Sequence, residues 1–351
     1  MKQTINSLVT FSNHDIYSVE NTNIFADKVN LKDFESEFVN WLKEYCNMYS
    51  DEQLQQYLND VVKNTSIQTL FNEFSIYAEN FYGFAIPLNL KQMDDTINMA
   101  QSGNTIYVNS VMRSAFFSFI ANQIYHSETI ENENESLDCY RYNLFLLNEM
   151  CYGDFKRPIV FPNGESAFAI IKKFQGKENL LTLSADIYYS AMAFAFSHEI
   201  AHAYLKHKAE GYSLTKEIEA DMNAYNMFLR FCDDVYTKKI KSNFADCMKP
   251  HVYMAPMYLL DFYYIVYYTG SFLCMYCDPV EKTFFDDIVK RKEKLFDVFY
   301  AYENGISPEE SYDLYNFYLD GVESFLRTFV ASDKGGMLDK LKYDNERMSP
   351  I

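Results

Sequence analysis

The segment that most constrains the fold of this chain begins at Ser184, from which a helix can run without a break to about Lys208. Its first half contains the run "AMAFAF", which carries no charge, and the polar pattern H-E-x-x-H follows at once with His198, Glu199 and His202. Burying polar groups without partners costs free energy. Because the helix is otherwise apolar, these three polar side chains are expected to have hydrogen-bond partners or to bind a ligand.

The spacing of the two histidines suits a metal ion. Residues four apart lie on one face of a helix, so His198 and His202 can both direct a ring nitrogen to one point about 2.0–2.1 Å away. Glu199 is about 100° further around the helix, where it can flank the metal and take a proton from a bound water. The alternative is an amphipathic helix whose polar face reads H-E-x-x-H and finds ordinary partners.

A second acidic cluster, "KEIEAD", supplies a third ligand. The segment "AEGYS" (209–213) predicts a break, after which a second helix can fold back toward the histidines. Glu217 and Asp221 then share a face, while Glu219 lies about 200° from Glu217 and points elsewhere. We predict a Zn²⁺ site with Glu217 as the third ligand, Glu199 as the base and Asp221 as a hydrogen-bond acceptor for a ligating histidine.

"HEIAHAYLKH" followed by "EIEAD" resembles the gluzincin metallopeptidases, in which a glutamate on a following helix completes HExxH. His207 stands five residues past the second predicted ligand. With this histidine included, the sequence motif is similar to that of prenyl-protease-type zincins and of the soluble Lit-type phage-exclusion and ImmA-type peptidases. Metzincins differ, because they carry glycine and histidine where this chain has Leu205 and Lys208. ImmA-type proteins usually have Asn at the position of Asp221, so the Lit-type resemblance ranks first.

The resemblance implies a zinc-dependent endopeptidase that hydrolyses an intracellular protein in bacterial antiphage defence. It also implies a zincin-like core. Two other classes stay open at this point. One is a catalytically silent zincin-fold sensor that binds a protein partner, although the intact base Glu199 argues against it. The other is a purely structural helical protein.

Composition narrows the partners. The net charge of −18 argues against binding to a nucleic-acid backbone or an anionic membrane surface, so a protein or peptide substrate is expected. The N-terminus shows no apolar signal region, and the seven cysteines are scattered, which together predict a cytoplasmic protein. Residues 257–277 are apolar but contain Asp261 and Gly270, so we predict a buried helix with Cys274 and Cys277 rather than a membrane span.

The expected fold is mostly α (α+β), with a small sheet and the HExxH helix in the core and additional helices around it. We expect an N-terminal helical region over 1–100 and the metallopeptidase domain with C-terminal helices over 101–351. The predicted helices are 31–49, 51–64, 66–81, 110–126, 184–208, 213–233, 252–277, 281–301 and 308–331, and the predicted strands are 105–109 and 157–162.

Three smaller questions stay open. His207 lies about 140° from His202 on a continuous helix, so we interpret it as a partner of the helix C-terminus rather than a ligand. The oxyanion could be stabilised by His251, Tyr253 or Tyr225. Either predicted strand could pair with the backbone of a substrate.

Overall fold

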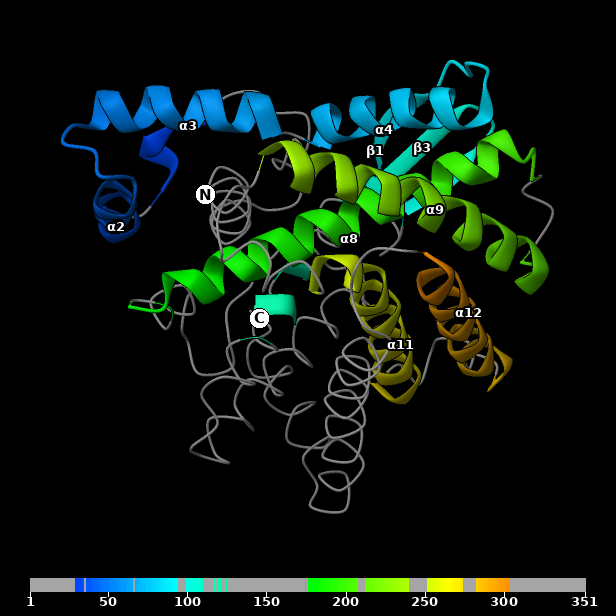
Figure 1. Cartoon of the computed structure of the whole chain (residues 1–351). Helices are drawn as coiled ribbons and strands as arrows, with labels where there is room; N and C mark the ends of the chain where they lie inside the picture. Colours follow the sequence, from blue (N-terminus) through cyan, green and yellow to red (C-terminus); the bar gives the residue numbers. More distant parts are fainter. Residues whose placement is uncertain are drawn as a thin grey trace, which may run out of the picture.

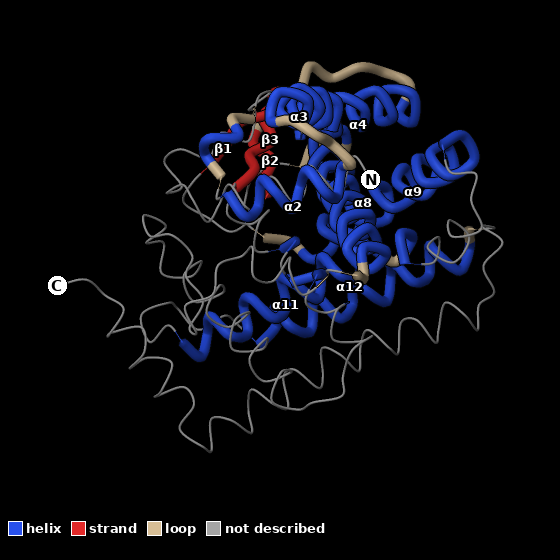
Figure 2. Tube along the Cα trace, turned by 90° about the vertical axis from the view of Figure 1, so that its left-hand side faces the viewer, coloured by secondary structure: helices blue, strands red, loops and turns tan. Residues whose placement is uncertain are grey.

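The computed structural model describes residues 29–93 (without 35 and 66), 99–109, 176–207, 212–239, 251–273 and 282–302, with a few single positions between 116 and 124 and at 174. In this part of the chain helices predominate, and three short strands form one sheet at one side (Figures 1 and 2). The mostly helical α+β prediction is therefore confirmed.

The elements follow one another as η2 (Leu31–Asp33), α2 (Ser36–Cys46), α3 (Asp51–Thr65), α4 (Ile67–Tyr82), β1 (Asn89–Met93), β2 (Met99–Ser102), β3 (Thr105–Asn109), α8 (Glu178–Tyr204), α9 (Leu214–Lys239), α11 (Ala255–Leu273) and α12 (Lys282–Ala301). The prediction of one continuous helix over 31–49 is wrong, because two separate elements stand there. The Asn30 side chain caps the short η2, and α2 begins separately at Ser36. The predictions 110–126 (largely), 157–162 and 308–331, and Cys274 with Cys277, lie outside the described residues.

Helix α8 forms the centre of the structure. Every residue from 190 to 201 is buried, and α8 packs against α4, α9, α11 and β2 (Figure 1). A helix that is apolar on all sides must be covered on all sides. Consequently, the polar side chains of H-E-x-x-H lie inside the protein, where each needs a partner.

Helix α8 ends at Tyr204, so the predicted extension to about 208 is wrong. Lys206 adopts a left-handed backbone conformation with φ 56°. Its N–H donates to the Ala203 carbonyl (3.2 Å), and the N–H of His207 donates to the His202 carbonyl (3.0 Å). These two bonds form a Schellman motif, a turn that usually contains glycine at the left-handed position. Because lysine stands there instead, no stop signal is visible in the sequence.

Helix α9 packs against α8 through aromatic rings. The ring of Phe194 meets those of Tyr225 and Phe228 edge to face, with centroids 6.0 and 6.2 Å apart. The small residues Ala220 and Ala224 on α9 are fully buried. The packing fixes the rotation of α9, and thereby the direction in which its acidic residues point.

The sheet has the order β1-β3-β2. The central strand β3 is parallel to β1 and antiparallel to β2, and the predicted turn at 102–104 joins β2 to β3 through Gly103. The strand prediction at 105–109 is confirmed, whereas β1 and β2 were not predicted because neither contains a β-branched or aromatic residue. Strand β2 crosses the expected domain boundary near residue 100, and that boundary stays a prediction.

Helix α11 covers most of the apolar segment 257–277. It packs against α8 and α12, and the buried Asp261 on α11 accepts a hydrogen bond from Lys292 of α12. Among the described helices none is long and apolar enough to cross a membrane.

Truncating Phe194 tests the packing between α8 and α9. We expect Phe194→Ala to lower the free energy of unfolding by about 3–5 kcal/mol, because it leaves a cavity between the two helices. The same truncation at Phe84, whose side chain is 48% exposed, is the matched control and should cost much less. Urea denaturation measures both values, and equal losses would contradict the packing described.

Candidate metal centre

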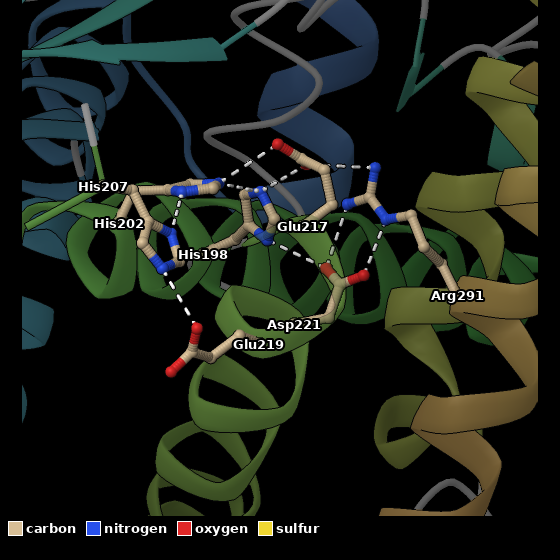
Figure 3. A network of polar contacts seen from close by, with 7 residues as sticks. All are labelled: His198, His202, His207, Glu217, Glu219, Asp221 and Arg291. Atoms are coloured by element: carbon tan, nitrogen blue, oxygen red, sulfur yellow. Dashed lines mark hydrogen bonds and ion pairs between the residues drawn. The ribbon is translucent and has the colours of Figure 1, made fainter. Parts of the chain in front are cut away.

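Three side chains from two helices converge on one point. His198 and His202 come from α8 and Glu217 comes from α9 (Figure 3). The two histidine Nε2 atoms lie 3.0 Å apart, and the Glu217 oxygens lie 3.3 Å from His198 Nε2 and 3.5 Å from His202 Nε2. Within the described residues this is the one group of three or more such side chains close enough to share a metal ion.

The spacing of these donor atoms fits a tetrahedral metal. Ligand atoms held about 2.0–2.1 Å from zinc at tetrahedral angles lie roughly 3.3 Å from one another. The Nε2–Nε2 distance of 3.0 Å is close to that value, Glu217 faces the two rings with its two different oxygens, and one ligand atom from each residue lies within 4.8 Å of the others. Two imidazoles and one carboxylate also match the donor set of a zinc site that keeps a fourth position open.

Asp221 contacts the ring nitrogen of His198 that is not part of the metal-binding group. Its carboxylate is fully buried on α9, one turn after Glu217, and its Oδ1 lies 2.8 Å from Nδ1 of His198. The ring N–H does not point straight at this oxygen, so the contact is a close ion pair and not an aligned hydrogen bond. With a proton kept on Nδ1 beside Asp221, His198 can bind a metal through Nε2, which gives up its own proton when the metal binds.

Arg291 on α12 completes the site and was missed by the sequence analysis. Its Nε donates to Oδ2 of Asp221 (2.6 Å) and its Nη2 to Oδ1 (2.9 Å), while Nη1 lies 3.3 Å from Oε2 of Glu217. It stands in "VKRKEK", a charged run typical of a solvated helix face, 70 residues after Asp221. No local pattern distinguishes it from its neighbours.

These contacts decide the charges of the buried groups. Burial alone would raise the pKa of Glu217, but the two histidines and Arg291 outweigh it and hold that pKa well below its usual range. Arg291 and His198 likewise lower the pKa of Asp221 against the effect of burial. Burial would lower the pKa of His198, yet Asp221 and Glu217 raise it to about 10. Both carboxylates are therefore ionised.

Glu199 follows His198 on α8, is buried, and is not among the three residues that could share the ion. Burial raises its pKa to about 7, with the charge of Glu217 adding to the effect and that of His198 opposing it. The backbone N–H of Gln101, on β2, donates a hydrogen bond to the Glu199 carboxylate. A carboxyl group with a pKa near neutrality can both accept and release a proton.

The remaining acidic residue of the cluster, Glu219, points away from the metal-binding group and is exposed. Its Oε2 lies 3.2 Å from Nε2 of His207, whose Nδ1 lies 2.8 Å from Nδ1 of His202. Because α8 ends before His207, the angle expected on a continuous helix does not apply. The Schellman turn brings this imidazole back to the ring of His202 (Figure 3).

Two of the three oxyanion candidates have other partners. The hydroxyl of Tyr225 donates to the carbonyl of Tyr253 (2.7 Å), and the hydroxyl of Tyr253 donates to Asp233. The role of His251 stays a prediction. Strand β3 has neighbours on both sides, which leaves no open edge for a substrate strand, and residues 157–162 lie outside the described residues.

The comparison with protein families gives one match. Residues 120–258 match the family described as Peptidase U49. The segment contains all five residues predicted for the site, whereas Arg291 lies beyond it. No curated protein and no solved structure matches the chain.

Removing the guanidinium of Arg291 should destabilise the metal-free protein. Arg291→Met leaves the buried Asp221 carboxylate without its forked partner, which should lower the free energy of unfolding by about 3–5 kcal/mol. Arg291→Lys keeps the charge but not the fork, so its loss should be smaller. Lys290→Met is the control, because an exposed ion pair contributes about 0–1 kcal/mol. A loss at Arg291 no larger than at Lys290 would refute this role.

Proposed function

We propose that this chain, whose residues 120–258 match the family described as Peptidase U49, is a zinc-dependent endopeptidase that cleaves a protein substrate. The observation that carries the proposal is the convergence of His198, His202 and Glu217, each of which offers one ligand atom within 4.8 Å of the other two, close enough to share one ion. The family match confirms the resemblance to Lit-type metallopeptidases and supports peptide-bond hydrolysis as the reaction.

Zinc held by these three residues supplies Lewis acidity toward the scissile carbonyl and makes a water acidic enough to react near neutral pH. Hydrolysis also requires that a proton be moved from the attacking water to the leaving amine. Glu199 directly follows the ligand His198 in the sequence and has a pKa near 7, so it can accept the proton of the attacking water and deliver it to the leaving amine. The cycle ends with Glu199 ionised again.

Strand β2 has a defined place in this proposal. The backbone of Gln101 on β2 contributes to lowering the pKa of Glu199 against the effect of burial, which relates the base to this strand. Strand β2 is also an outer strand of the sheet and packs against α8, the helix that bears the histidines. A substrate backbone laid along β2 would therefore pass close to the base, which favours β2 over β3 as the pairing strand.

The Lit-type resemblance supports an intracellular protein as substrate and antiphage defence as the setting. We propose both on that resemblance. The cleaved protein can be identified by mapping new protein N-termini across the proteome of bacteria that produce the chain, before and after phage infection.

The matched variant for this experiment is Glu199→Gln. It should keep its zinc but lose several orders of magnitude in hydrolysis, because the glutamine amide cannot accept the proton. His202→Ala should lose both zinc and cleavage. New N-termini that appear with the wild type and disappear with Glu199→Gln support the proposal.

Two results would count against it. Equal cleavage by wild type and Glu199→Gln would refute Glu199 as the base. Zinc bound by a folded wild type that produces no Glu199-dependent cleavage in either condition would instead favour the silent sensor.

A further inference from the structure

His202, the second histidine of the motif, is contacted by His207, which in turn contacts Glu219. Nδ1 of His202 lies 2.8 Å from Nδ1 of His207, and Nε2 of His207 lies 3.2 Å from Oε2 of Glu219 (Figure 3). Neither His207 nor Glu219 belongs to the group of donor atoms that could hold the metal. The two side chains form a line of contacts that starts at the surface and ends on His202.

The chemistry of imidazole decides which nitrogen donates and which accepts in each of these contacts. A histidine that offers Nε2 to a metal must carry its proton on Nδ1. The Nδ1–H of His202 can then donate only to an unprotonated Nδ1 of His207. A neutral His207 with a bare Nδ1 carries its own proton on Nε2, which faces the carboxylate of Glu219. One proton on each ring satisfies both contacts.

We propose that His207 and Glu219 are positioning residues that hold His202 in the tautomer and ring orientation needed to bind zinc. They would do for His202 what Asp221 does directly for His198. The inference rests on the proposed function, because it takes His202 to be a metal ligand. It gives all three acidic residues of "EIEAD" a role at one site.

The backbone shows why His207 can reach this place. The Schellman motif at the end of α8 binds the His207 N–H to the His202 carbonyl, so the two residues are joined through both backbone and side chain. The motif holds Lys206 in a left-handed conformation that is unfavourable for a residue other than glycine. The His207 side chain is only 11% exposed, which shields its contact with His202 from water.

The two residues should not contribute equally. A partner that orients a metal-bound histidine is typically worth about 10–100-fold in metal affinity. His207 touches His202 directly and is shielded, so its loss should fall in that range. Glu219 acts one step further away, and its side chain is 54% exposed, so solvent weakens its effect to a few-fold.

The test is a zinc-affinity titration against a chromophoric chelator. His207→Phe keeps an aromatic ring but has no nitrogen, and it should weaken zinc binding about 10–100-fold. His207→Asn places an amide oxygen near the position of Nδ1, so it can still accept the proton of His202 and should restore most of the affinity. Restoration by Asn distinguishes hydrogen bonding from mere filling of space.

Glu219→Leu provides an independent arm, because an exposed position tolerates substitution even if His207→Phe does not fold. It should weaken zinc binding a few-fold, whereas the control Glu79→Leu, at an exposed position on α4, should not change it. The absorption spectrum of the cobalt-substituted protein gives a second readout, since a misoriented His202 alters the ligand field in His207→Phe but not in His207→Asn.

The outcomes separate the inference from the proposed function. Wild-type affinity in both His207→Phe and Glu219→Leu would overturn the inference alone, provided that His202→Ala still loses zinc. Equal losses in His207→Phe and His207→Asn would also overturn it, because the ring would then act only by packing. Unchanged zinc affinity in His202→Ala would remove the metal site itself, and the inference with it.

Discussion

The buried carboxylate of Asp221 is the constraint on which the rest of the site depends. It lies inside the protein with no exposed surface, between His198 of α8 and Arg291 of α12. An isolated charge in such a place would be strongly unfavourable. Only an arrangement in which α8, α9 and α12 are all docked gives this carboxylate its partners, so the same contacts that satisfy Asp221 also assemble the metal centre.

Helix α9 carries most of the site. Glu217, Glu219 and Asp221 each face a different histidine nitrogen, two of them directly at the metal-binding group and one through His207. Glu217 and Asp221 share one face of the helix and Glu219 lies on another, which allows one short segment to contact His198 and His202 and, through His207, His202 a second time. The rotation of α9 is set in turn by the aromatic contacts of Phe194, so packing several residues away controls where the ligands point.

Arg291 changes the electrostatics of this arrangement. Two ionised carboxylates next to each other would repel, and the guanidinium lies between them, with contacts to both. The guanidinium therefore offsets the repulsion between the Glu217 and Asp221 carboxylates. This charge comes from α12, outside the residues that match the family model, so the C-terminal part of the described chain also contributes to the site.

The sequence revealed those parts of the site that follow from helical spacing. His198 and His202 share a face at four residues apart, and so do Glu217 and Asp221, because a regular helix leaves no other choice. Contacts that depend on tertiary structure were not predictable. Arg291 stands in an ordinary charged run, and His207 reaches His202 only because Lys206 adopts a conformation that favours glycine.

The fold shows the same division between local pattern and tertiary context. Long periodic segments such as α3 and α4 were predicted closely, because their apolar spacing is unambiguous. The strands β1 and β2 have little strand-like composition and are strands only because β3 lies between them. The break after η2 depends on the Asn30 cap, a local signal that the apolar spacing of 31–49 concealed.

The central claim, that two histidines and one glutamate of this chain hold a zinc ion, is tested most directly by X-ray absorption at the zinc edge of the purified protein. We expect about one zinc per chain, with only nitrogen and oxygen ligands at about 2.0–2.1 Å and scattering from two imidazole rings. The Glu217→Ala variant should lose most of that zinc. Sulfur ligands at about 2.3 Å, or a zinc content unaffected by Glu217→Ala, would contradict the account.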